Sequence, residues 1–279
     1  MAQVEQSAHP VQQLREVVAS LEASVLLCLA KPGKVAVHRL RTSTRRVQAQ
    51  LELLSMLPDL PPHGPQARKA VRLLKQFRQA AGQVRDIDVQ RDLVRDEVAG
   101  SKVAPLPDPE LGREARRLRR MLKRNGKEAA ERLLRLLHKQ RARLPLAFQK
   151  LLDALVPAES IALSETELIA LARDCYRNRR EPSLQEEPPQ DTAELHKIRK
   201  RAKLARYLAE SAPQSFLEAQ QLAAQFATLQ QAGGEWHDWT ILKEVAIAEL
   251  GDAALLPRRF AEHANRALRA FQRQLRYRI

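Results

Sequence analysis

A chain of 279 residues is long enough to bury a real hydrophobic core, either as one large domain or as two of ordinary size. Lys and Arg outnumber Asp and Glu by 48 to 33, so the formal net charge is +15 and the partner is expected to be a polyanion: nucleic acid, an anionic membrane or a phosphate polymer. No stretch approaches the roughly 18 uncharged apolar residues of a membrane span, and residues 1–10 lack a signal-peptide pattern, so we expect a cytoplasmic protein without a membrane partner.

Composition favours an all-α fold. Only 4% of the residues are aromatic and 9 are glycine, and no segment shows the sustained alternation of a strand. Cys28 and Cys175 lie in apolar helical patterns without CxxC spacing, so we interpret them as reduced core thiols. We expect no cofactor and no bound metal.

Apolar residues recur at helical spacing through the first half, which predicts helices over about 11–30, 35–56 and 65–81, and a shorter one after Asp86. Gly82 is expected to end the third of these helices. Three prolines within 101–109 indicate a loop. The segment 110–155 is predicted as one very long helix or two consecutive ones, with Pro145 as a break or kink.

The second half begins with a capping box, because Ser164 stands three residues before Glu167 at the start of a helix running to about 179. Prolines and acids indicate a loop over 181–191. Further helices are predicted over about 192–210, 213–231, 239–250 and 253–276. Because this order repeats that of the first half, we predict two helical-bundle repeats, 1–157 and 158–279.

Two histidines mark matching basic segments. His38-Arg39-Leu40-Arg41 aligns with His196-Lys197-Ile198-Arg199, and Arg45 then stands opposite Lys203. A second match follows in each half, Gly82-Gln83-Val84-Arg85-Asp86 against Gly234-Glu235-Trp236-His237-Asp238. Two linked matches in the same order indicate an internal duplication.

The basic residues of each matching segment share one helix face. At about 100° per residue, Leu40, Thr44 and Val47 form an apolar stripe, and His38, Arg41 and Arg45 lie on the opposite side. The second copy places His196, Arg199, Lys200, Lys203 and Arg206 together in the same way. Like charges one turn apart disfavour a helix by roughly 0.2–0.5 kcal/mol per pair, and an anion along the face would remove that repulsion. His38 to Arg45 spans roughly 10 Å, which suits several successive phosphates.

Weaker candidates lie elsewhere. Arg116, Arg120 and Lys123 share a face of the helix after residue 110 and could extend the binding groove; Lys75 and Arg78 raise the same question on the third helix. For all five, a solvated helix surface stays an alternative. We interpret Asp86, Asp88 and Asp238 as helix caps or partners of arginines, and Trp236 and Trp239 as core residues.

The paired motifs resemble the CHAD family, the conserved histidine α-helical domain, whose hallmark is a duplicated His-x-x-Arg-x-x-x-Arg/Lys helix followed by a Gly-x-x-Arg-Asp-like segment. The resemblance covers nearly the whole chain. It implies two pseudo-symmetric four-helix bundles with a basic channel or surface that binds inorganic polyphosphate, and association with polyphosphate granules. His237 in place of Arg85 and Thr240 in place of Asp88 depart from the first copy, which puts the charge of the second downstream segment in doubt.

Residues and resemblance together give one set of candidate polyphosphate-binding residues: His38, Arg39, Arg41, Arg45, Lys75, Arg78, Arg116, Arg120, Lys123, His196, Lys197, Arg199, Lys200, Lys203 and Arg206. We expect binding without catalysis, because no P-loop or clustered acidic set accompanies the cations. Nucleic-acid binding is the alternative, although aromatic residues are sparse and no nucleic-acid-binding signature is present. The sequence predicts neither oligomeric state nor the preferred polymer length.

Overall fold

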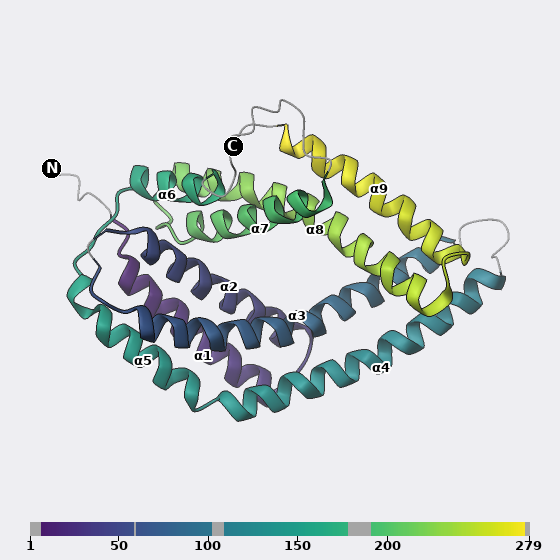
Figure 1. Cartoon of the computed structure of the whole chain (residues 1–279), viewed down its shortest axis with the longest axis horizontal. Helices are drawn as coiled ribbons and strands as arrows, with labels where there is room; N and C mark the ends of the chain where they lie inside the picture. Colours follow the sequence, from purple (N-terminus) through teal and green to yellow (C-terminus); the bar gives the residue numbers. More distant parts are fainter. Residues whose placement is uncertain (1–6, 59, 102–108, 178–190, 277–279) are drawn as a thin grey trace.

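The computed structural model describes residues 7–58, 60–101, 109–177 and 191–276, and within these ranges the chain is helical with short connections (Figure 1). The only extended pairing in the described part is one isolated antiparallel bridge between Ala8 and Leu163. The predicted all-α fold is therefore confirmed. No helix in these ranges is both long and apolar enough to span a bilayer.

The first half of the chain forms the lower layer in Figure 1. Its helices are α1 (Pro10–Ala30), α2 (Lys34–Met56), α3 (Gly64–Ser101), α4 (Pro109–Gln140) and α5 (Arg143–Leu155), followed by the short 3₁₀ helix η1 (Val156–Ala158). Each of the first three helices packs against the next, and α5 returns along α3 and α1. Buried apolar residues of all five helices form one core.

The second half lies above it. Its helices are α6 (Glu165–Arg177), α7 (Thr192–Ala209), α8 (Leu217–Leu250) and α9 (Leu255–Leu275). The two layers meet where α2 packs on α7 and α3 on α8, and again at the far end of the molecule, where α4 packs on α9. The functional site lies at the first of these meetings.

Two predicted helix breaks are wrong. The helix expected to end before Gly82 continues through it as α3, and the helices expected over 213–231 and 239–250 are one helix, α8. A glycine inside a helix costs only about 1 kcal/mol relative to alanine. Burial on both sides of the glycines offsets that cost, because Phe77 and Val84 flank Gly82 in the core, and Leu229 and Trp236 flank Gly233 and Gly234.

Other predicted boundaries are confirmed. The segment 110–155 is two helices, and Pro145 lies in the first turn of α5, where its missing N–H is not needed. Ser164 and Glu167 form the predicted capping box: the Ser164 N–H donates to Glu167 Oε2 at 2.8 Å, and the Glu167 N–H to Ser164 Oγ at 3.3 Å. Residues 102–108 and 178–190, which hold most of the two predicted loops, lie outside the described residues.

The apolar cores cross the division predicted at residue 157. The core of the second half also contains Leu53 of α2, Val94 of α3 and Leu118 of α4. Cys28 and Cys175 are buried and not joined in a disulfide, as expected. Trp236 and Trp239 are buried core residues, which confirms their interpretation. The two-repeat boundary and the duplication itself stay predictions.

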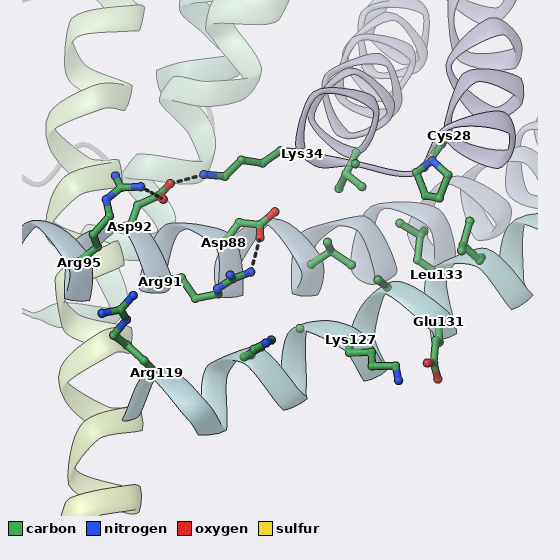
Figure 2. Close-up of a pocket in the computed structure, with 18 of the residues that line it drawn as sticks. Cys28, Lys34, Asp88, Arg91, Asp92, Arg95, Arg119, Lys127, Glu131 and Leu133 are labelled. Atoms are coloured by element: carbon green, nitrogen blue, oxygen red, sulfur yellow. Dashed lines mark hydrogen bonds and ion pairs between the residues drawn. The ribbon is translucent and has the colours of Figure 1, made fainter. Parts of the chain in front are cut away.

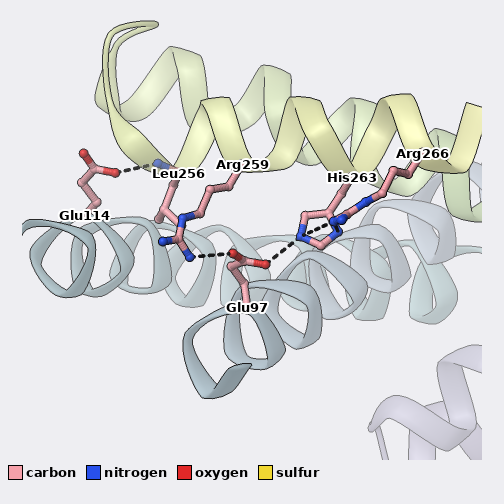
Figure 3. A network of polar contacts seen from close by, with 6 residues as sticks. All are labelled: Glu97, Glu114, Leu256, Arg259, His263 and Arg266. Carbon is pink, nitrogen blue, oxygen red and sulfur yellow. Dashed lines mark hydrogen bonds and ion pairs between the residues drawn. The ribbon is translucent and has the colours of Figure 1, made fainter. Parts of the chain in front are cut away.

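Two glutamates of the lower layer hold α9 in place (Figure 3). Glu97 on α3 accepts hydrogen bonds from Arg259 at 3.2 Å and from the His263 ring at 2.8 Å, and that ring stacks on Trp239 with centroids 4.2 Å apart. Glu114 on α4 accepts from the backbone N–H groups of Leu255 and Leu256, at 3.0 and 2.8 Å. Since the N-cap residue of α9, Ala254, has no side-chain oxygen to offer, Glu114 caps α9 from another helix.

Replacing Glu114 by alanine should therefore lower the free energy of unfolding by about 1–2 kcal/mol, the usual effect of removing a helix cap. Urea unfolding followed by circular dichroism measures this loss. Glu128→Ala, which removes an exposed carboxylate from the same helix, is the matched control. Equal unfolding free energies for the two variants would show that Glu114 does not stabilise α9.

Candidate functional site

A cavity of about 920 Å³ lies between the two halves, lined by residues of α2, α3, α7 and α8, with Cys175 of α6; we call it the central cavity. Eight Lys and Arg residues line it, against two aspartates: Arg41, Arg45, Arg78, Lys197, Arg199, Lys200, Arg201, Lys203, Asp86 and Asp238. This excess of positive charge sets the sign of any ligand, which must be an anion.

The burial pattern of α2 and α7 shows most directly how the sequence directs basic side chains into the cavity. Leu40 and Val47 are fully buried on one side of α2, which turns Arg41 and Arg45 toward the cavity on the other. On α7, burial of Ile198 and Ala202 does the same for Arg199 and Lys203. The predicted facing geometry of these four cations is thus confirmed.

The uninterrupted α3 and α8 complete the cavity. Arg78, Gly82 and Asp86 line it from α3, and His237 and Asp238 from α8. Because both aspartates stand in the middle of long helices, neither caps a helix start, and that part of their interpretation is wrong. Arg78 donates a hydrogen bond to Gln48 of α2, which joins two sides of the cavity.

Burial and mutual repulsion lower the pKa of several basic side chains of the central cavity. Burial, with the neighbouring Arg41, Arg45 and Arg199, lowers the pKa of the Lys203 amine to about 6. Burial and nearby arginines also lower the pKa of Arg45 to about 10. For Arg199 the pKa is lowered by burial first, although Asp238 acts in the opposite direction. Opposite charge is therefore too sparse in the cavity to offset the desolvation of these groups.

Three nitrogens at the cavity are buried without a hydrogen-bond partner among the described residues: Arg45 Nε, Arg199 Nε and His237 Nδ1. A buried polar group without a partner costs about 1–3 kcal/mol, and more when it is charged. Burial, and then Arg199, lowers the pKa of His237 to about 3, so its ring is neutral near pH 7 and has one N–H to donate. An anion in the cavity would supply the negative charge that Arg45 and Arg199 lack.

The two aspartates offset only part of the positive charge, because they face eight Lys and Arg residues. Burial raises the pKa of Asp238, and the carboxylate of Asp86 raises it further, while Arg85, Arg199 and Arg41 lower it. Of the described residues, no group of three or more His, Cys, Asp or Glu side chains is arranged to hold a metal ion.

Seven of the predicted binding residues lie at the central cavity: Arg41, Arg45, Arg78, Lys197, Arg199, Lys200 and Lys203. Arg78 was one of the weaker candidates, and its position becomes clear only once α3 is known to be continuous. The remaining predicted residues lie elsewhere.

Neither of the two motif histidines, His38 and His196, lines the central cavity. His38 is exposed and lines, with Arg39, a smaller hollow between α1 and α2. Arg39 is two residues from Arg41, and residues at that spacing do not share a helix face. His196 is half-buried; its ring stacks on Trp236 with centroids 4.6 Å apart and meets the edge of His237 at 5.1 Å. His196 therefore contacts the cavity residue His237 but does not line the cavity itself.

The other candidates have different surroundings. Arg206 does not line the cavity and forms an ion pair with Glu210 at 2.6 Å. Lys75 is exposed on α3 and does not line the cavity. Arg116, Arg120 and Lys123 line a separate groove between α3 and α4, with the α1–α2 turn at its side (Figure 2). These three residues therefore do not line the central cavity, and their part in binding stays a prediction.

Sequence reasoning missed several lining residues, including Gln83, Arg201, Tyr207 and His237. His237 offered a signal, because it aligns with Arg85 at the cation position of the second motif. The sequence offered no such signal for Arg201, whose side chain is largely buried and pairs with Glu194 at 3.4 Å.

One glycine sets the position of Arg199. A Cβ atom on Gly233 would lie 2.9 Å from the Phe271 ring and 3.1 Å from Cγ of Arg199, closer than ordinary contact allows. Phe271 is fully buried and stacks on Trp236, so the ring has little room to move. Gly233 thus lets α7 and α9 approach α8 closely enough to hold Arg199 at the cavity.

Comparison with known proteins agrees with this architecture. The model of the CHAD domain family matches residues 12–246. PptA from Streptomyces chartreusis is similar in structure with a TM-score of 0.66 at 15% identity, over 98% of this chain and 100% of that one. The CHAD domain from the plant Ricinus communis gives 0.63 at 13%, over 100% and 95%. At these identities the two likenesses show the fold. No curated protein matches.

Gly233→Ala should lower the free energy of unfolding by about 1–3 kcal/mol, as overpacking of a core usually does. The neighbouring Gly234 is the matched control, because nothing lies within 4 Å of a Cβ atom there. Gly234→Ala should stabilise the protein by up to about 1 kcal/mol through its helix propensity. Urea unfolding of both variants tests this, and equal effects would contradict the role given to Gly233.

Lys203 should make stability depend on pH. The pKa of its amine is about 6 in the folded protein, against an ordinary value of 10.5, so between these values the unfolded chain binds more protons than the folded one. The free energy of unfolding therefore rises with pH through this window, and falls as pH drops toward 6. Lys203→Met should remove that dependence.

The variant should be more stable than the unmodified protein near pH 6, and its advantage should shrink toward pH 9. Urea unfolding at several pH values measures the difference. Lys150→Met, on the exposed side of α5, should leave the pH dependence unchanged. Parallel pH profiles for Lys203→Met and the unmodified protein would show that the pKa of the Lys203 amine is not lowered in the folded protein.

Proposed function

The chain belongs to the CHAD domain family, and from that premise we propose that it binds inorganic polyphosphate in the central cavity without cleaving it. The observation that carries the proposal is the group of half-buried cations Arg41, Arg45, Arg199 and Lys203, whose charge Asp86 and Asp238 offset only in part. A bound polyanion supplies the missing negative charge.

The chemistry of the side chains suits phosphate oxygens. The guanidinium groups of Arg41 and Arg199 can each hold two oxygens at once, while Lys203 offers a single charged donor when protonated. Bound negative charge favours the protonated amine, so binding near pH 7 draws a proton onto Lys203. Phosphates repeated along a thin linear chain can meet cations from α2, α3 and α7 in turn.

Nucleic acid fits the cavity less well. Proteins that bind single strands stack bases on exposed aromatic rings, and both tryptophans are buried in the core. Tyr207 is the aromatic residue that lines the cavity in the described part of the chain.

Binding without cleavage is part of the proposal. Phosphoryl transfer usually needs carboxylates that hold divalent metal ions, or a nucleophile held in line with the leaving group. The carboxylates of the cavity are those of Asp86 and Asp238, and burial raises the pKa of Asp238, which works against metal binding there. We expect a protein with this activity to collect at polyphosphate granules.

The test is polyphosphate binding at physiological salt by isothermal titration calorimetry. The double variant Arg41→Gln/Arg199→Gln should bind at least about tenfold more weakly, because a hydrogen bond between charged groups contributes roughly 1.5–3 kcal/mol. Arg68→Gln/Arg72→Gln removes the same charge from exposed positions nearer the start of α3, outside the cavity lining, and should bind as the unmodified protein does.

Three results would contradict the proposal. Equal losses in the two double variants would show that net charge alone attracts the polymer. Displacement of polyphosphate by single-stranded DNA at equal phosphate concentration would favour nucleic acid as the ligand. Release of orthophosphate from polyphosphate with Mg²⁺ or Mn²⁺ present would show that the protein is an enzyme.

A further inference from the structure

The groove between α3 and α4 has a volume of about 1200 Å³ and lies on the other side of α3 from the central cavity; we call it the α4 groove (Figure 2). The cavity uses Arg78, Gly82 and Asp86 of α3, whereas the groove uses Asp88, Arg91 and Arg95. At about 100° per residue these two sets fall on opposite faces of the helix. One helix thus separates two basic hollows.

The exposed surface of the α4 groove is cationic. Three apolar residues of its floor, Val37, Val84 and Leu133, are largely buried. Eight Lys and Arg residues line the groove, against three carboxylates. Two of those carboxylates are engaged: Asp92 pairs with Lys34 and with Arg95, and Asp88 lies 3.8 Å from Arg91.

The cations of α4 form a straight row. Residues 115–127 contain no Asp or Glu, and Arg116, Arg120, Lys123 and Lys127 fall within one narrow stripe of the helix. At about 1.5 Å per residue this row is roughly 16 Å long. These four side chains line the groove, are exposed, and form no ion pair within the described ranges.

The groove offers cations from more than one direction. Figure 2 shows Arg119 extending from α4 toward α3, while Arg91 comes from α3 and Lys34 from the α1–α2 turn. Gly126 keeps α4 close to α3, since a Cβ atom there would lie 3.3 Å from Ile87. A linear polyanion lying along the row would therefore meet charge from α4 and from the helices beside it.

We propose that the α4 groove is a second polyphosphate site, which holds a separate stretch of a chain whose first stretch occupies the central cavity. This inference rests on the proposed function. Two sites that take one polymer act together, because the second stretch binds at the high effective concentration set by the linking phosphates. A short chain fills the cavity alone, so the protein prefers long polymers.

The test compares tripolyphosphate with a long linear polyphosphate of defined length. The variant Arg120→Gln/Lys123→Gln should bind the long polymer at least about tenfold more weakly, and tripolyphosphate as the unmodified protein does. Arg41→Gln/Arg199→Gln should weaken binding of both ligands. Arg68→Gln/Arg72→Gln, of equal charge, should weaken neither. Since Arg120 and Lys123 are exposed, the groove variant should unfold as the unmodified protein does.

A second measurement locates the polymer directly. Reductive methylation read by mass spectrometry should show that long polyphosphate protects Lys123 and Lys127, that tripolyphosphate does not, and that Lys150 on α5 is protected by neither. Unchanged long-polymer affinity in the groove variant, with a loss in the cavity variant, overturns the second site and leaves the proposed function intact. The reverse pattern overturns the cavity as the site of the proposed function. Equal losses for long polyphosphate and single-stranded DNA in the groove variant overturn the choice of ligand.

Discussion

Mutual repulsion among Arg41, Arg45, Arg199 and Lys203 is the interaction on which the rest of the architecture depends. These groups are brought together by the packing of α2 on α7, and burial lowers the pKa of three of them. Such an arrangement opposes its own assembly, so attraction elsewhere must hold the halves together. Apolar residues from both halves share one core, and the carboxylates of Glu97 and Glu114 bind α9 at the far end of the molecule.

The helical repeat is sufficient to predict which cations of α2 and α7 face the cavity. Burial of Leu40 and Ile198 fixes the rotation of each helix, and Arg41 and Arg199 follow from it. The rotation of a helix does not show how far the cavity extends along the helix axis. His38 was therefore expected to line the cavity, but it lies outside it. Nor does the rotation specify contacts between helices, such as the stacking of His196 on Trp236. Arg78 and His237 could be placed only with the packing of α3 and α8.

Glycine was the residue type that the sequence predicted least well. A glycine between two helical patterns ordinarily indicates a break, yet Gly82, Gly126, Gly233 and Gly234 all lie inside helices. Two of them are spacers: Gly233 admits Phe271 and Arg199, and Gly126 admits Ile87. Whether a glycine marks a helix break or a close contact between helices depends on what a Cβ atom there would touch. Those contacts come from helices distant in the sequence. The same composition therefore fits a broken helix and a closely packed one.

The position of α3 bears on how two bound stretches of polymer would affect one another. Anions in the central cavity and the α4 groove would lie on opposite faces of one helix, and each stretch would meet its own surplus of cations. Local neutralisation limits the repulsion between the stretches, because screening in salt acts over about 8–10 Å. Filling the cavity also relieves the repulsion among its cations, which the polymer in the groove does not require. Under the two-site proposal, affinity for short chains would be set by the half-buried cations of the cavity, while preference for long chains would be set by the exposed and more strongly salt-screened row on α4.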